Sequence, residues 1–385
     1  MFFHFPRPPL ITFLGSAIAL SLAVILRISL LPYESTDVRD FISPWYDYIV
    51  AHGGFPALKD NFANYTPPYL YLLVFVSTYL ASLSKLTAIK LITFPFEGLS
   101  AFFVYKLVHL RYPVGNLSLI AAFTLLFSPT LVLNGAYWGQ CDVIYATGLL
   151  GCLYFVSIGR INWALIALGI AFSFKQQALF ISPFLIVLFF RKMIRWQSFL
   201  WIPLVYLVMI IPARLAGRPL KELVSIYFNQ ATSYQYLTLN APNLYQWIPN
   251  EFYRPVAAIG LIITLILIML LITLVVDSEV KLSQPLLIQL ALISVLMMPY
   301  FLPKMHDRYF FAADVFSIVF GFYYPQYFFV PIAINLVSLF TYISFFIRSF
   351  MIPPSILSLF LAGVILALLY LLNQSLYPPE DQEIK

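Results

Sequence analysis

Charged residues are scarce in this sequence: Asp, Glu, Lys and Arg make up only 10% of its 385 residues. A soluble domain usually carries about 25%. Hydrophobic residues reach 62%, against roughly 45–50% in soluble proteins, and the mean hydropathy is +0.89. A water-soluble fold of this length could not bury that much apolar surface. The composition therefore excludes a soluble protein and predicts an all-α integral membrane protein. Residues 1–385 would form a single membrane domain with no soluble domain.

Cysteine is almost absent, with only Cys141 and Cys152 in the chain. Both fall on one predicted helix, and their spacing turns them away from each other, so a disulfide is not expected. No Cys and His residues have the spacing of a zinc site. The sequence also shows no internal repeat, no low-complexity tract and no linker.

Acidic residues are outnumbered by basic ones, 16 against 22, which gives a formal charge of +6 and a pI of about 9.1. In a soluble chain this excess would suggest nucleic acid. Here the basic residues are scattered among apolar segments. The charge therefore predicts contact with anionic membrane lipid or a phosphorylated lipid substrate, and no nucleic acid.

Long apolar runs dominate the chain, and a membrane helix needs about 20 such residues. Together they predict about 11–13 membrane helices. The first run follows Arg7 and lacks a small-residue cleavage site, so we expect it to be retained. The runs cover 10–31, 67–84, 88–108, 117–134, 143–158, 161–174, 176–190, 197–216, 255–276, 285–302, 309–323, 326–347 and 352–372.

Two long loops, 32–66 and 217–254, separate these runs. Short connections rich in Arg and Lys tend to stay in the cytoplasm, and the clearest covers 191–195. Placing it inside puts both long loops outside, provided that 67–84 does not cross the membrane. The chain's unusual polar clusters then collect on the extracytoplasmic face.

Carboxylates form two of these clusters. Asp37 and Asp40 follow the first span and could act as a general base, as metal ligands or as a solvated loop. Asp142 closes a second cluster with Trp138 and Gln140. An uncompensated Asp in the membrane costs roughly 2.5–3.5 kcal/mol. We therefore expect Asp142 to face a partner or a cavity, or to satisfy a helix N-terminus.

Cations form the other two clusters. Lys175 lies between two short apolar segments and could be an interfacial anchor or could face a phosphate. Lys304, His306, Asp307 and Arg308 lie within five residues between apolar helices. Arg binds phosphate through paired hydrogen bonds and His can shuttle a proton, although a plain charged turn is the alternative.

Five motifs occur in a fixed order along the chain: STDVRD (35–40), NYTPP (64–68), YWGQCD (137–142), KQQALFISP (175–183) and MHDRYF (305–310). In this order they resemble the GT-C superfamily of polytopic glycosyltransferases. Within it the chain resembles bacterial mannosyltransferases related to the second mannosyltransferase of GPI-anchor assembly, and the dolichyl-phosphate-glucose glucosyltransferases. The resemblance covers residues 35 to 310. The chain lacks the further lumenal insertions of GPI-specific members, which speaks against a GPI acceptor.

The resemblance implies a GT-C-type helical bundle with interfacial helices in the first extracytoplasmic loop. It also implies transfer of a hexose, mannose or glucose, with inversion, from a polyprenyl-phosphate-linked donor. The acceptor would be lipid-linked or a glycan, and the active site would lie on the extracytoplasmic face, here of a bacterial inner membrane.

The same resemblance assigns roles to individual residues. Asp37 is the expected base, with Asp40 second. Lys175 and Arg308 would bind the donor phosphate, assisted by His306 and Lys304. The residues expected to contact the sugar or acceptor are Tyr65, Trp138, Gln140, Asp142 and Gln176. No cofactor is implied, because a lipid monophosphate leaves without a metal. A divalent ion held by Asp37, Asp40, Asp142 and Asp307 is the alternative.

Two other functions remain open from the sequence. A secondary transporter or lipid flippase would use intramembrane charged groups, although no matched repeats are found. The candidates are Glu97, whose partner the sequence does not identify, together with Asp142, Lys175 and Asp314. A multispan oligosaccharide polymerase or ligase would instead use arginines of an outer loop, here Arg218 and Arg254.

Overall fold

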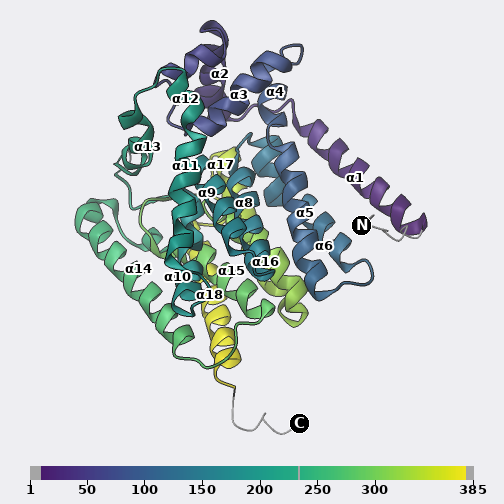
Figure 1. Cartoon of the computed structure of the whole chain (residues 1–385), viewed down its shortest axis with the longest axis vertical. Coiled ribbons are helices and arrows are strands. Elements are labelled where there is room, and N and C mark those ends of the chain that lie inside the picture. The colour runs from purple at the N-terminus through teal and green to yellow at the C-terminus, as the bar shows by residue number, and fades with distance from the viewer. Residues whose placement is uncertain (1–9, 233–234, 379–385) are drawn as a thin grey trace.

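The computed structural model describes residues 10–232 and 235–378 and is built almost wholly of helices (Figure 1). Within this part, seven helical stretches are long and apolar enough to cross a membrane. A bent pair, Leu117–Leu126 with Pro129–Tyr137, makes up to eight. The chain is therefore an all-α, multi-pass membrane protein, as its composition predicts.

The helices of the N-terminal half are α1 (Leu10–Leu30), α2 (Ser43–Ala51), α3 (Pro67–Tyr79), α4 (Lys85–Leu91), α5 (Phe94–Arg111), α6 (Leu117–Leu126), α7 (Pro129–Val132), α8 (Asp142–Ser157) and α9 (Ile161–Phe174). Those of the C-terminal half are α10 (Ser182–Phe190), α11 (Trp201–Met209), α12 (Ile211–Leu215), α13 (Leu220–Thr232), α14 (Tyr253–Val276), α15 (Gln284–Phe301), α16 (Phe311–Tyr323), α17 (Phe329–Ile347) and α18 (Pro354–Leu376). Two short strands, β1 (Thr238–Leu239) and β2 (Met305–His306), pair in parallel.

The core of the bundle is formed by α8, α15 and α16, which are buried along most of their length. Several apolar helices in and around this core are shorter than a typical membrane span, among them α9 with 14 residues and α16 with 13. These short helices pack against other helices, so lipid does not have to cover them. Gly148 shows how close this packing is, because an added Cβ there would lie 2.8 Å from the Ala167 carbonyl oxygen.

The first helix lies at the edge of the bundle, at the upper right of Figure 1, and is mostly exposed. Arg27 anchors its end by pairing with Glu97 of α5 and donating to the Leu126 carbonyl oxygen at 2.9 Å. Lys90 donates to the carbonyl oxygens of Leu30 and Tyr33. Glu97 thus has a partner, and the start of loop 32–66 is fixed against α4 and α5.

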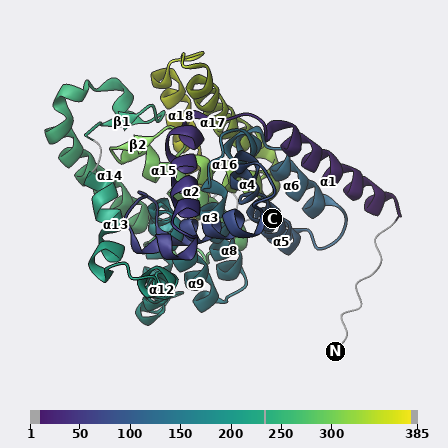
Figure 2. The same ribbon diagram turned by 90° about the horizontal axis from the view of Figure 1, so that it is seen from above.

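Segment 67–84, which the orientation argument assumes does not cross the membrane, forms a short helix. The helix that forms there, α3, has 13 residues and opens with Pro67 and Pro68, where missing N–H groups cost nothing. The following stretch, residues 85–111, has 27 residues and is apolar enough to span. Figure 2 looks down on this end of the bundle, where α2, α3 and α4 lie in front of the spanning helices.

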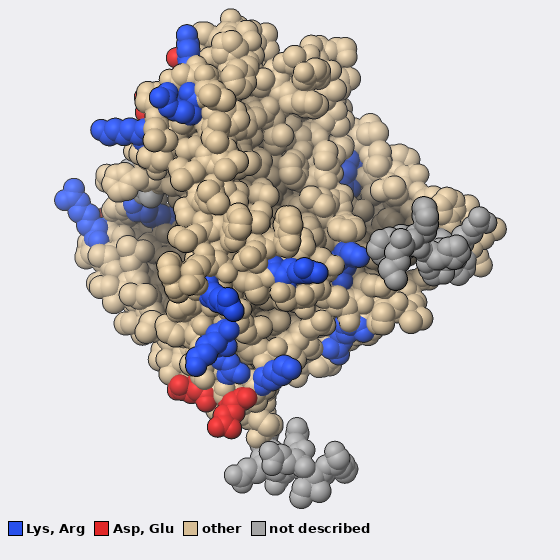
Figure 3. Space-filling model, in the orientation of Figure 1, with Lys and Arg blue, Asp and Glu red and all other residues tan. Residues whose placement is uncertain are grey.

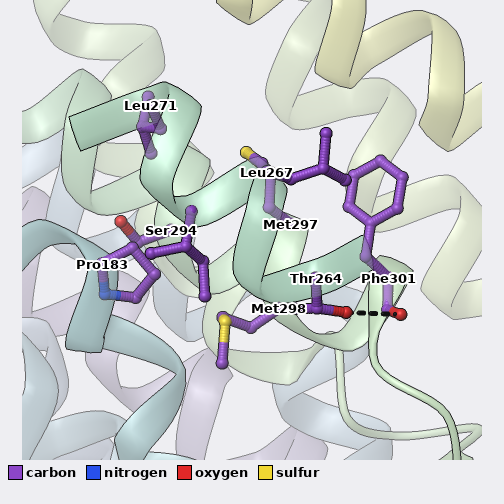
Figure 4. A pocket seen from close by; sticks show the side chains of 9 residues that line it. Pro183, Thr264, Leu267, Leu271, Ser294, Met297, Met298 and Phe301 are labelled. Carbon is purple, nitrogen blue, oxygen red and sulfur yellow. Dashed lines mark hydrogen bonds between the residues drawn. The ribbon is translucent and has the colours of Figure 1, made fainter. Parts of the chain in front are cut away.

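The surface matches a bundle surrounded by lipid. The face seen in Figure 3 is mostly uncharged, and most of its basic side chains lie across the lower half and along the left edge. Inside, α14 and α15 enclose a cavity of only about 10 Å³ (Figure 4). The Phe301 carbonyl oxygen at the end of α15 accepts hydrogen bonds from Thr264 and Tyr245, so this helix end is satisfied.

Candidate active site

Two π-helical turns bring the first and third motifs together. Asp37 directly precedes the turn Val38–Ile42, and Trp138 directly follows the turn Leu133–Tyr137. Such turns are uncommon and occur often at functional sites. Gly139 allows the two segments to touch: it has φ +77°, and an added Cβ would lie 2.4 Å from Val38 Cγ2.

Asp37 is held through one oxygen of its carboxylate. Oδ2 accepts hydrogen bonds from Trp138 Nε1 at 3.1 Å, from Gln140 Nε2, and from Arg308 at 3.2 Å. No described residue donates to Oδ1. The side chain is 19% exposed. One oxygen therefore fixes the carboxylate, while the other is available to a ligand.

Asp142 forms a second, buried carboxylate centre at the first residue of α8. Lys175 Nζ donates to Oδ1 at 2.6 Å, and Asn134 Nδ2 donates to Oδ2 at 2.9 Å. The expectation that Asp142 faces a partner is confirmed by this buried ion pair. Burial favours the neutral amine of Lys175, but Asp142, Cys141 and Tyr65 together raise the pKa of that amine well above its usual range. Lys175 is therefore charged.

Arg308 lies between the two carboxylates. Its guanidinium contacts Asp37 at 3.2 Å and Asp142 at 3.7 Å, and it stacks 5.5 Å from the centre of the Trp138 ring. Its Nε is buried and donates no hydrogen bond within the described residues. Two carboxylates and two cations thus make a neutral cluster, in which the buried Nε of Arg308 faces Asp142 at 3.7 Å without forming a hydrogen bond.

Tyr65 joins this cluster from loop 32–66. Its hydroxyl donates to Gln140 Oε1 at 3.3 Å, and Lys175 Nζ lies 5.2 Å from the centre of its ring. Burial raises the pKa of Tyr65 to about 12, so the hydroxyl keeps its proton. Trp45 packs against the same ring. Gln140 therefore links Tyr65 to Asp37.

Lys304 and His306 lie on the segment that precedes Arg308, and the strand pair fixes that segment. His306 pairs with Leu239 in the parallel register, and Lys304 Nζ lies 5.3 Å from the centre of the Tyr253 ring. His306 Nδ1 contacts the carboxylate of the buried Asp307. The second long loop therefore packs on the MHDRYF motif, a contact that the sequence did not predict.

Asp40 lies apart from the cluster. It forms an ion pair with Arg39 at 2.7 Å, and its side chain is 49% exposed. The hydrogen bond from Arg39 lowers the pKa of Asp40. Of the two candidate bases, only Asp37 is joined to the other motifs.

Gln176 is half-buried at the start of the 3₁₀ turn Gln176–Ile181, directly after Lys175.

Asn134 belongs to the cluster and was missed by sequence reasoning. Its amide nitrogen donates to Asp142, while its Oδ1 is buried without a partner in the described part of the chain. A polar residue at the end of the apolar run 117–134 was the available signal. The sequence also did not predict the contact of Ser35, whose hydroxyl donates a hydrogen bond to the Trp138 carbonyl oxygen at 2.6 Å.

The four carboxylates considered for a divalent ion do not converge. Asp37 and Asp142 share Arg308, Asp307 contacts His306, and Asp40 pairs with Arg39. Over residues 10–232 and 235–378, no group of three or more His, Cys, Asp or Glu side chains is placed to hold a metal ion. The donor set of this cluster suits an anion better than a cation.

Two charged residues that the sequence offered for a polymerase or a transporter have side-chain partners in the structure. Arg218 is buried between Asn61 and Glu222, where it joins the second long loop to the first. Asp314 accepts a hydrogen bond from Ser338 at 2.7 Å.

The fold defines the class of this protein as a multi-pass helical membrane protein with a buried charged cluster at one end. No known protein-family model and no curated protein matches its sequence. The resemblance to GT-C glycosyltransferases thus stays a prediction from the five motifs.

Proposed function

We propose that this protein is an inverting glycosyltransferase of GT-C type, with about 11–13 membrane helices in a bacterial inner membrane. It would transfer mannose or glucose from a polyprenyl-phosphate-linked donor to a lipid-linked or glycan acceptor. The reaction would take place on the extracytoplasmic face. The observation that supports this most is Arg308, which lies between two carboxylates and whose buried Nε donates no hydrogen bond to any described residue.

Asp37 is the base in this proposal. Three donors hold Oδ2, which leaves Oδ1 to accept the proton of an acceptor hydroxyl. The acceptor oxygen attacks the anomeric carbon as the proton moves to Asp37. The bond from that carbon to the phosphate oxygen breaks, and its electron pair leaves with the polyprenyl phosphate. Attack opposite the leaving group inverts the anomeric centre.

Arg308 and Lys175 stabilise the leaving phosphate, whose negative charge grows as the bond breaks. A phosphate competes with Asp37 for Arg308, since both are anions that fit the guanidinium. When Arg308 turns to the phosphate, Asp37 loses a neutralising partner and accepts a proton more readily. Donor binding would thus prepare the base. His306 and Lys304, which are only partly buried, assist at the edge of the site.

The sugar pocket would be formed by Tyr65, Trp138, Gln140, Asp142 and Gln176. An aromatic ring offers an apolar face to a sugar ring, and amide and carboxylate groups bind its hydroxyls. The choice between mannose and glucose depends on a few such hydrogen bonds. No soluble cofactor takes part, since the phosphate of the donor is already an adequate leaving group.

The test is release of polyprenyl phosphate by purified protein incubated with a panel of polyprenyl-phosphate hexoses and a membrane lipid extract. We expect release with one donor, and Asp37→Asn should lower turnover by on the order of 100-fold or more. Asp40→Asn is the matched control and should keep near-normal turnover, because Asp40 lies outside the cluster. Uptake or flipping in proteoliposomes without release from any donor would overturn the proposal in favour of a transporter.

A further inference from the structure

A groove of about 690 Å³ runs between α6 and the pair α16–α17, away from the charged cluster. Its walls include Leu117 and Phe127 on one side and Phe322 and Ile332 on the other. Arg308 lies just before the first residue of α16, whereas the groove follows the last part of that helix. Because α16 is about 20 Å long at 1.5 Å per residue, the far end of the groove is distant from the proposed phosphate site.

The polar side chains in the groove are already satisfied. Ser128 donates to Asn335 Oδ1 at 2.9 Å, and Asn335 Nδ2 donates to the Pro331 carbonyl oxygen at 2.9 Å. An occupant therefore needs no polar group inside the groove. The volume falls within the roughly 300–1,000 Å³ of typical ligand pockets. Since the walls belong to membrane helices, a hydrocarbon chain is the occupant that fits.

A cation stands at one end of this groove. Arg111, the last residue of α5, stacks on Tyr112 at 5.6 Å and on Tyr323 at 5.4 Å. Tyr112 lines the groove. Among the described residues, no carboxylate pairs with Arg111. A guanidinium beside tyrosines at the end of a membrane helix suits a lipid phosphate.

We propose that this groove binds one acyl chain of an anionic phospholipid from the surrounding membrane, with Arg111 meeting its phosphate. The bound chain would also support a bend in the fold. Phe127, Ser128 and Pro129 line the groove where the chain turns by 43° between α6 and α7. The turned segment leads on to Trp138. The inference rests on the groove and on Arg111, and it stands whether or not the protein transfers sugars.

The first experiment is native mass spectrometry of the full-length protein with phosphatidylglycerol or phosphatidylcholine carrying the same acyl chains. We expect one retained phosphatidylglycerol, preferred about tenfold over phosphatidylcholine. Arg111→Gln should remove this preference. Arg195→Gln, which changes an exposed basic residue elsewhere, should leave it intact. Equal retention of both lipids by the unchanged protein would overturn the proposal.

A second pair of variants tests the groove itself. Ile332→Trp fills it and should lower retention of phosphatidylglycerol about tenfold, since the chain loses its apolar contacts. Leu336→Trp changes an exposed residue of the same helix that does not line the groove, and it should have no effect. Normal retention by Ile332→Trp would contradict the proposal.

A third measurement starts from the unchanged protein, so its main result does not depend on a variant that might misfold. Phosphatidylglycerol with a photoreactive group at the chain end should label peptides containing Ser128 or Asn335 in the unchanged protein. Excess phosphatidylglycerol should compete and phosphatidylcholine should not. If polyprenyl phosphate displaces the label, and Arg308→Gln prevents this displacement, the groove belongs to the sugar donor and the phospholipid proposal is wrong.

Discussion

Arg308 and Asp37 are 271 positions apart in the chain, yet the guanidinium of one contacts the carboxylate of the other at 3.2 Å. The same guanidinium lies 3.7 Å from Asp142. It therefore ties the last motif to the first and to the third. A lysine at this position would keep the charge but lose the planar fork that serves several partners at once.

We expect Arg308→Lys to lower kcat/KM by on the order of 100-fold, with a clear rise in the KM for the donor. Steady-state release of polyprenyl phosphate at varied donor concentration measures both constants. Arg195→Lys is the control, because it makes the same exchange at an exposed position outside the cluster and should leave both constants unchanged. An unchanged KM for the donor in Arg308→Lys would remove Arg308 from the donor site.

The apolar runs of the sequence predicted the positions of the helices well, because a helix surrounded by lipid needs a long run of apolar residues. The run 161–174 coincides with α9, and the run 285–302 is shifted by one residue from α15. The contacts of the charged groups could not be found in this way. Nothing in the sequence pairs Glu97 with Arg27, since partners in a helical bundle are set by which helices become neighbours.

The sequence predicted which motifs form the candidate site, but not how their residues are arranged in space. The order of five motifs named Asp37, Asp142, Lys175 and Arg308, and all four lie in one cluster. It could not separate Asp37 from Asp40, because both are acidic residues of the same motif. That distinction depends on the π-helical turn at Val38–Ile42, within which Asp40 is half-exposed and pairs with Arg39.

The buried pair of Lys175 and Asp142 should matter for stability. Lys175→Met leaves the Asp142 charge in the bundle without its main partner, which costs about 3–5 kcal/mol when one member of a buried pair is removed. Unfolding in mixed detergent measures this free energy. The double variant Lys175→Met with Asp142→Asn should recover part of the loss, because no isolated charge remains.

An exposed pair provides the contrast. Lys85 contacts Asp47 at 2.8 Å near the surface, and surface ion pairs contribute little. Lys85→Met should therefore leave the free energy of unfolding nearly unchanged. Equal losses in Lys85→Met and Lys175→Met would show that burial of the Lys175 pair is not what stabilises the fold.

Gly139 tests whether the Asp37 loop must approach Trp138 as closely as it does. In Gly139→Ala the new Cβ would meet Val38 Cγ2 at 2.4 Å and push the Asp37 segment away. Because displacement of a catalytic group by about 1 Å can cost 100-fold, we expect a loss of turnover on that order while the protein still folds. Steady-state kinetics with a thermal unfolding curve separates the two effects.

Two further variants test whether the collision with Val38 is what lowers turnover in Gly139→Ala. Gly53 has the same φ of +77°, but an added Cβ there would meet open space. Gly53→Ala therefore introduces backbone strain without a collision, and it should keep activity. Val38→Ala in the Gly139→Ala background removes the colliding methyl group and should restore part of the turnover. No recovery in the double variant would mean that the contact with Val38 does not position Asp37.

The orientation of the chain decides which compartment the charged cluster faces. The positive-inside tendency predicts that the basic connection 191–195 lies in the cytoplasm and, if 67–84 does not cross the membrane, that loop 32–66 lies outside. Lys175 itself is a poor reporter because it is 7% exposed, but Ala51 and Gln197 are exposed, and both native cysteines are buried. In intact spheroplasts, an impermeant maleimide should label Ala51→Cys and not Gln197→Cys. After permeabilisation both should react. The reverse pattern would place Asp37 and Arg308 on the cytoplasmic side, where soluble nucleotide sugars are available. The proposal of a lipid-linked donor would then no longer be supported.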